Sequence, residues 1–164
     1  MTHQTTLRYS ETLLRRSVFA FWRRTVGLGF LVALVFVGGG LAQLLYKGDT
    51  SWIVGALAVA LVVGVSFIVA IYVVHFRNAM QKFRDMGTPE ALLVVEDKAF
   101  TLTSGIGSTS LAWSSIAEVW CFTDFWLLLF SKAQFSTIPL ANVSPEMQTF
   151  VLQRVRSAGG KIVG

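Results

Sequence analysis

Chemically reactive side chains are scarce in this chain of 164 residues. It contains one cysteine, Cys121, and neither of its two histidines lies beyond residue 75. A single cysteine excludes an internal disulfide and any zinc site built from cysteines. We therefore expect Cys121 to be a small buried side chain of a cytoplasmic domain.

The carboxylates of residues 89–164 also lack a catalytic pattern. Catalysis needs a base, a nucleophile or a pair of carboxylates within reach of one another. The acids here are spread along the sequence without a shared motif, and they include Glu96, Asp97, Glu118, Asp124 and Glu146. The glycine-rich stretch 105–110 lacks the lysine of a phosphate-binding loop, so a hairpin turn explains it better. We expect a protein that is not an enzyme, with no catalytic residues, no metal site and no cofactor.

Charge is absent from two long apolar runs, residues 25–46 and 52–74, which hold 22 and 23 residues. At ~1.5 Å per residue, each run can cross the ~30 Å hydrocarbon core of a bilayer as a helix. A helix of a soluble protein rarely stays apolar on all sides for so long, because one face normally meets water. With no ionisable residue inside either run, a channel or transporter is not expected. The sequence therefore predicts a membrane protein with two transmembrane helices.

The connection between the runs, residues 47–51, is too short for a folded segment and predicts a helical hairpin with both chain ends on one side. Basic residues flank the outer ends of this hairpin, whereas the connection holds only Lys47 beside Asp49. The positive-inside rule therefore places both termini in the cytoplasm. The residues expected to contact lipid head groups of the inner leaflet are Arg15, Arg16, Arg23, Arg24, Arg77 and Arg84.

The net charge of +5 is concentrated beside the predicted spans. Nine basic and three acidic residues give +6 over residues 1–88, whereas five basic and six acidic residues give −1 over residues 89–164. Basic residues next to membrane spans suit anionic lipid head groups. We therefore expect the lipid bilayer as a partner, and no nucleic acid.

Six segments follow from these boundaries. Residues 1–24 are predicted to form a cytoplasmic amphipathic juxtamembrane segment, in which Ser10 caps a helix and Glu11 pairs with Arg15. The remaining segments are the first transmembrane helix, residues 25–46, the external loop, 47–51, the second transmembrane helix, 52–76, a helical extension, 77–88, and a cytoplasmic domain, 89–164.

Small residues recur at four-residue spacing within the two spans. Helices in lipid associate mainly through close van der Waals packing, which small side chains permit. We expect such packing to hold the hairpin together or to pair it with a second copy. The residues predicted to do so are Gly29, Ala33, Ala56, Ala60 and Gly64.

From residue 91 onward the apolar pattern changes from helical to alternating, which is typical of strands. Strands are predicted over residues 91–96, 98–104, 109–113, 116–122, 125–130 and 135–139. Ser144 then supplies a cap and Pro145 a first-turn proline for a C-terminal amphipathic helix. We expect Trp113 to be buried against Phe100, Leu102 and this helix. The predicted fold class is a membrane α-helical hairpin plus a small α+β PH-like half-barrel closed by the C-terminal helix.

Several features of the chain can be compared with known families: the strand 96–103, Leu111-Ala112-Trp113 with Ile116 three residues on, residues 126–130, Ile138-Pro139 and the terminal helix. In these features the chain resembles the YcxB-like bacterial membrane proteins, which implies a location at a bacterial inner membrane. The resemblance also implies two transmembrane helices followed by a small PH-like cytoplasmic domain, and it implies no particular activity. Relatives often carry a basic residue after the proline; this chain has Leu140, so no basic site is inferred there.

These observations predict a protein that acts by binding. Its partner is an unidentified protein, with a second copy as one candidate, bound through the hairpin and the PH-like domain. Trp120, Phe125 and Trp126 would mark the partner surface if they remain exposed, because aromatic side chains commonly anchor interfaces. Two alternatives remain open: an immunity-type protein that neutralises a membrane-directed toxin, and a weak lipid-binding sensor.

Overall fold

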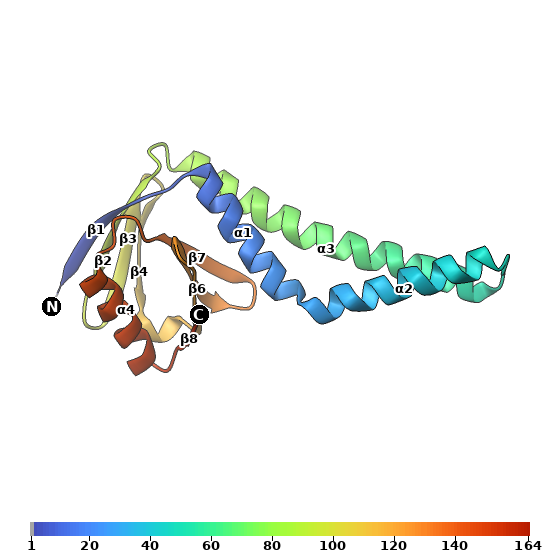
Figure 1. Ribbon diagram of the computed structural model, residues 1–164. Coiled ribbons are helices and arrows are strands. Elements are labelled where there is room, and N and C mark those ends of the chain that lie inside the picture. Colours follow the sequence, from blue (N-terminus) through green and yellow to red (C-terminus); the bar gives the residue numbers. More distant parts are fainter. Residues whose placement is uncertain (1) are drawn as a thin grey trace. The chain divides into compact units, whose positions relative to one another are not determined.

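The computed structural model describes residues 2–164, and its elements follow the order shown in Figure 1. The chain divides into two compact units. One comprises the described residues of Met1–Ser17 together with Asn78–Gly164, and we call it the sheet unit. The other, Val18–Arg77, is the helical unit. Each unit is described below by itself.

The first sheet of the sheet unit is antiparallel throughout, in the order β1-β2-β3-β4. Its strands are β1 (His3–Arg8), β2 (Glu90–Val95), β3 (Ala99–Ser104) and β4 (Gly107–Ala112). The N-terminal strand β1 pairs with β2 along its whole length, with Leu7 opposite Ala91. It therefore joins the beginning of the chain to the domain that starts more than eighty residues later.

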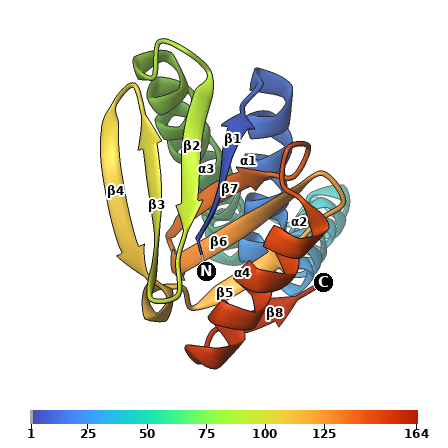
Figure 2. The ribbon, with the colours of Figure 1, turned by 90° about the vertical axis from the view of Figure 1, so that its left-hand side faces the viewer.

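The second sheet has the order β7-β6-β5-β8. Its strands are β5 (Glu118–Cys121), β6 (Phe125–Ser131), β7 (Gln134–Pro139) and the short C-terminal β8 (Lys161–Val163). Strand β8 runs parallel to β5, whereas β5, β6 and β7 are antiparallel. A 3-10 turn, η1 (Trp113–Ser115), and the helix α4 (Pro145–Ser157) complete the unit (Figure 2).

Helix α4 begins where the sequence predicts. The Ser144 hydroxyl accepts a hydrogen bond from the Met147 backbone N–H at 3.2 Å, and Pro145 occupies the first turn. The backbone N–H of Glu146 and the Ser144 hydroxyl also lower the pKa of the Glu146 carboxyl below its ordinary value. A capping hydroxyl and a first-turn carboxylate both suit the positive end of a helix.

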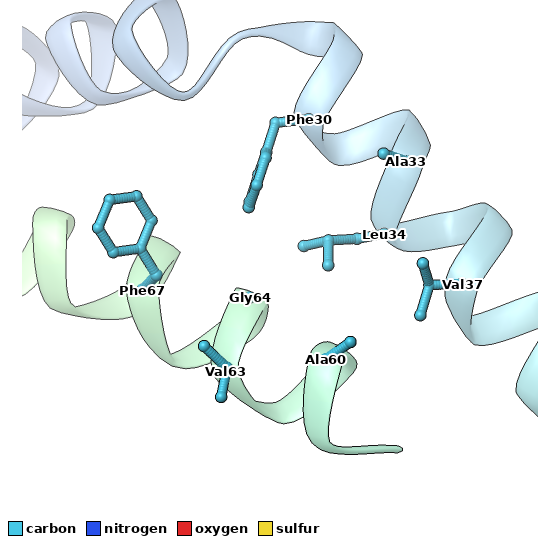
Figure 3. Close-up of a pocket in the computed structure, with 8 residues that line it drawn as sticks. All are labelled: Phe30, Ala33, Leu34, Val37, Ala60, Val63, Gly64 and Phe67. Carbon is cyan, nitrogen blue, oxygen red and sulfur yellow. The ribbon is translucent and has the colours of Figure 1, made fainter. Parts of the chain in front are cut away.

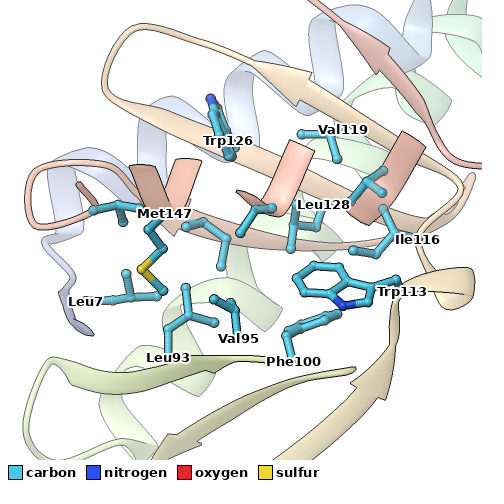
Figure 4. Packing of buried hydrophobic residues seen from close by; sticks show 14 residues of the cluster. Leu7, Leu93, Val95, Phe100, Trp113, Ile116, Val119, Trp126, Leu128 and Met147 are labelled. Carbon is cyan, nitrogen blue, oxygen red and sulfur yellow. The ribbon is translucent and has the colours of Figure 1, made fainter. Parts of the chain in front are cut away.

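The core of the sheet unit lies between inward-facing residues of both sheets and one face of α4 (Figure 4). Trp113 is buried within it, with its ring centroid 5.1 Å from that of Phe100. The indole Nε1 donates to the backbone oxygen of Glu96 at 2.9 Å, which satisfies its polar atom. Leu102 packs against the same cluster, and α4 contributes Met147, Val151 and Val155 to it. The predicted burial of Trp113 is confirmed.

Strand β6 is buried on both faces. Its residues Trp126 and Leu128 belong to the core cluster, while Leu127, on the opposite face, is fully buried as well. Leu127 pairs with Thr137 of β7, whose hydroxyl donates to the buried hydroxyl of Ser17 at 3.1 Å. Ser17 lies on the first turns of helix α1 (Glu11–Val26), so these turns cover the second face of the sheet.

In the helical unit, α1 ends at Val26 and is followed by α2 (Leu28–Tyr46) and α3 (Trp52–Asp85). Gly27, between α1 and α2, has a φ of 73°, a backbone conformation that residues other than glycine rarely adopt. Helices α2 and α3 are long enough and apolar enough to cross a membrane. Helix α3 also continues to Asp85, as the predicted extension of the second span requires.

Six predicted strands and the C-terminal helix are confirmed, with ends shifted by a few residues. Strands β1 and β8 were not predicted. Residues 1–24 were predicted to form a juxtamembrane segment, whereas residues 3–8 form a strand of the first sheet. A strand with only one large apolar residue, Leu7, gives little signal on its own. The helix over the first predicted span, α2, begins at Leu28, because Gly27 separates it from α1.

Candidate partner-binding site

Helices α2 and α3 meet where a leucine of one helix lies opposite a glycine of the other, at Leu34 and Gly64 and at Leu61 and Gly38. The shielded positions recur every three or four residues, as expected for one face of each helix. On α2 they are Leu31, Leu34, Val37, Gly38, Leu41 and Leu44, and on α3 they include Val54, Leu57, Leu61, Gly64 and Ile68. At Gly64 the helices approach closely: a Cβ there would lie 2.6 Å from Leu34 Cδ2. A side chain at position 64 would therefore require Leu34 to shift.

Beside this contact lies an apolar hollow between α2 and α3, with a volume of about 360 Å³ (Figure 3). Small side chains form part of its lining and leave the space empty. Phe30 of α2 and Phe67 of α3 line it as well and are largely exposed. The hairpin thus presents a concave apolar surface with aromatic residues on both helices.

The five predicted helix-packing residues take different positions. Gly64 packs against Leu34, which agrees with its predicted role. Ala33 and Ala60 line the hollow instead of forming the contact. A Cβ at Gly29 would meet nothing within 4 Å, and Ala56 is exposed. The small residues therefore do not form one continuous packing stripe within the hairpin.

An aromatic cluster joins α1 to α3 within the helical unit. The indole Nε1 of Trp22 donates to the backbone oxygen of Ile68 at 3.0 Å, and its ring meets Tyr72 edge-on with centroids 6.1 Å apart. Phe19 stacks on Trp22, and Tyr72 stacks on Phe76. These contacts were not predicted, although the four-residue spacing of Tyr72 and Phe76 is typical of residues on one helix face.

All six arginines predicted to contact head groups are exposed: Arg15, Arg16, Arg23, Arg24, Arg77 and Arg84. Two of them pair with carboxylates. Arg15 forms the predicted i, i+4 ion pair with Glu11 at 3.3 Å. Arg16 contacts Asp124 at 2.7 Å, so its guanidinium also holds α1 to the loop before β6.

The aromatic residues predicted to mark a partner surface are mostly inside the fold. Phe125 and Trp126 are 3% and 5% exposed, so neither can act as an exposed anchor, and that prediction is corrected for both. The reason is that β6 is covered on both faces. Trp120 is partly exposed, and its Nε1 donates to Glu118 Oε2 at 2.8 Å. Cys121, also predicted to be buried, is partly buried and packs against the core cluster.

A second concavity of about 290 Å³ lies near the end of α4, beside Trp113. Arg154 and Asp97 line it and form an ion pair with each other. The guanidinium carbon of Arg154 also lies 4.9 Å from the Phe150 ring centroid, a cation–π distance. Within residues 2–164 no three His, Cys, Asp or Glu side chains gather as metal ligands would. The ion pair of Arg154 and Asp97 thus holds α4 to the β2–β3 turn.

Comparison with known proteins gives one match. No curated protein and no solved structure matches the chain. Residues 95–153 match the family model described as YcxB-like protein, a stretch that runs from the end of β2 into α4. The resemblance inferred from the sequence is therefore confirmed over these residues, which lie within the sheet unit.

Proposed function

We propose that this protein is a two-span membrane protein that binds a protein partner and catalyses no reaction. The observation that carries the proposal is the distribution of exposed apolar side chains. Apart from Phe19, Leu92 and Ile106, every large exposed hydrophobic residue lies on α2 or α3. Such a surface is unstable in water and suits the interior of a bilayer.

The spacing of aromatic residues along α3 supports the same placement. Trp52 begins the helix and Tyr72 lies twenty residues further on, about 30 Å at ~1.5 Å per residue. This equals the ~30 Å thickness of the hydrocarbon core. Trp52 is 81% exposed, and Tyr46 at the end of α2 is 93% exposed. Tyrosine and tryptophan prefer the two membrane interfaces, so both ends of the span carry suitable residues.

Charge supports an orientation with both chain ends in the cytoplasm. Arg23, Arg24 and Arg77 lie near the inner ends of the proposed spans and are exposed. The external loop holds one positive charge, Lys47, beside Asp49. A hydrogen bond from the Ser51 backbone N–H to Asp49 Oδ1, 2.7 Å long, lowers the pKa of this carboxyl and keeps it ionised. The loop therefore carries a single basic residue, fewer than lie beside the inner ends of the spans, as the positive-inside rule favours for the external side.

The sheet unit would then be a cytoplasmic PH-like interaction domain. Its two four-stranded sheets and C-terminal helix support this assignment. Because Phe125 and Trp126 are buried, the proposed contact with the partner shifts toward the hairpin. The hollow between Phe30 and Phe67 offers a concave surface for an apolar helix of the partner.

A photo-crosslinking residue at Ala60, introduced into the full chain in native membranes, tests this proposal. Ala60 lines the hollow, whereas Ala70 is an exposed residue of the same helix outside it and serves as the control. We expect a protein adduct of defined mass at position 60 and only lipid adducts at position 70. Lipid adducts alone at both positions would contradict binding through the hollow.

A further inference from the structure

The edges of the two sheets differ in how they are protected. An edge strand exposes unpaired backbone groups that can pair with another chain, and proteins usually cover such an edge or place charges or proline on it. Four strands occupy edges here: β1 and β4 in the first sheet, and β7 and β8 in the second.

Three of these edges are protected. At β1, Asn142 accepts a hydrogen bond from the Thr5 hydroxyl at 2.6 Å and donates one to the Thr6 backbone oxygen at 3.0 Å. Strand β7 ends in Pro139, and the Tyr9 hydroxyl donates to its Thr137 backbone oxygen at 3.1 Å. Strand β8 has only three residues.

Strand β4 has none of these protections. Its six residues, Gly-Ser-Thr-Ser-Leu-Ala, include no charge and no proline, and all but Leu111 are exposed. Among the described residues, its only backbone partners are those of β3. The Ser115 hydroxyl donates to the Ala112 backbone oxygen at 2.7 Å. The part of the edge whose backbone groups remain available for pairing is therefore residues 107–111.

We propose that β4 pairs antiparallel with β4 of a second copy, joining the two first sheets into one continuous sheet. Two-fold symmetry places a strand opposite itself, so any charge on it would meet a like charge near the axis. Strand β4 carries no charge and avoids this cost. Its small side chains also offer no pocket or charge to select a foreign peptide sequence, which favours an identical strand as the occupant.

Hydroxyl rows on the exposed face of the sheet support the pairing. The Thr101 hydroxyl donates to Ser110 Oγ at 3.1 Å, and the hydroxyls of Thr103 and Ser108 lie 2.9 Å apart. Cross-strand pairs of this kind stabilise a sheet. In the proposed dimer, the rows would continue through Ser108 and Ser110 to the serines of the other copy.

Light scattering of the purified full-length protein in detergent tests this inference. We expect a dimer for the unchanged chain and a dimerisation affinity weakened roughly tenfold or more by Ser108→Lys with Ser110→Lys, because like charges would then face one another. Thr103→Lys is the matched control. It is exposed on the same face but one strand further in, ~4.8 Å from β4, and should leave the dimer intact.

A second set of variants distinguishes loss of pairing from loss of folding. Mixing Ser110→Lys chains with Ser110→Glu chains should restore pairing between unlike copies, which a folding defect would not allow. A monomer for the unchanged chain over the accessible concentration range would overturn the inference. A dimer that persists in the double lysine variant would also overturn it and would assign association to another surface, leaving the proposed membrane function unaffected.

Discussion

The largest apolar side chains point inward in the sheet unit and outward in much of the helical unit. Phe100 and Trp113 are 1% and 4% exposed, whereas Phe36 and Trp52 are 76% and 81% exposed. The two units have similar chemistry in their apolar residues and differ in where these residues face. Such a difference is what the proposed placement of the helical unit in lipid requires, because exposed apolar side chains are unfavourable in water.

The hydrogen bonds support the same contrast. In the sheet unit, buried polar atoms find specific partners, as Trp113 Nε1 does with the Glu96 oxygen and Thr137 with Ser17. In α2 the backbone bonds are internal to the helix, and the side chains add almost no polar groups. A helix of this kind satisfies its backbone without water, which is the condition for crossing a bilayer. Four predictions can break or sharpen this comparison.

The largest expected effect comes from emptying the core of the sheet unit. Trp113→Ala should destabilise this unit by roughly 3–5 kcal/mol, because a large buried ring leaves a cavity behind. Trp52→Ala, at an exposed position on α3, is the control and should leave the stability of the sheet unit unchanged. Urea unfolding of the full chain in detergent, followed by protease sensitivity of residues 89–164, measures the effect. Equal stability of both variants would show that Trp113 does not belong to a tightly packed core.

A smaller effect is expected from crowding the contact inside the hairpin. Gly64→Leu should cost roughly 1–3 kcal/mol, because its side chain would collide with Leu34. Gly55→Leu on the same helix meets open space and is the matched control. Thermal denaturation in detergent compares the two. If Gly55→Leu lowers the thermal stability more than Gly64→Leu does, Gly64 does not pack against Leu34 as described.

The third prediction concerns pH and the junction of α1 with the second sheet. Burial raises the pKa of the Tyr9 hydroxyl to about 12 from its ordinary value near 10. Tyr9 therefore contributes stability that is present below about pH 10 and is lost as pH rises through 12. Two pKa units correspond to at most ~2.7 kcal/mol, and partial exposure reduces the expected loss to about 1–2 kcal/mol.

Tyr9→Phe separates the pH-dependent stability due to the Tyr9 hydroxyl from that of other groups that titrate at high pH. The variant should lose less stability than the unchanged chain between pH 10 and pH 12, measured by urea unfolding at each pH. Parallel stability curves for the two proteins would mean that Tyr9 is solvated in the folded chain.

The smallest effect is expected at the buried hydroxyl pair. Ser17→Ala removes the partner of Thr137 and should cost ~1 kcal/mol. Combining it with Thr137→Val should recover part of the loss, because no orphaned hydroxyl then remains. The double-mutant cycle measures this coupling, and strictly additive effects would show that the two hydroxyls do not interact.

The sequence predicts the local elements of this protein better than their long-range pairing. Alternating residues from 91 onward and the Ser144-Pro145 start signal are local patterns, so six strands and α4 could be found. Strand β1 is stabilised by β2, which lies about eighty residues away, and its own composition is mostly polar. No local pattern indicates that partner.

The candidate site shows the same limit. Small residues in the spans were recognisable, but which of them face the neighbouring helix depends on the rotation of α2 against α3. Leu34 opposite Gly64 fixes that rotation and places Ala60 beside the hollow. Burial of Phe125 likewise depends on α1 covering the second face of β6, whereas Trp126 is buried in the core between the sheets and α4; the spacing of these residues reveals neither contact.

Membrane topology is the most direct test of the account. A reporter that is active only outside the cytoplasm can be inserted at Gly48, in the loop between α2 and α3, and separately fused after Gly164. We predict activity for the insertion at Gly48 and silence for the fusion after Gly164, because the exposed arginines beside the spans should stay in the cytoplasm. An active fusion after Gly164 with a silent insertion at Gly48 would contradict the proposed orientation, and silence of both in a soluble protein would contradict membrane insertion itself.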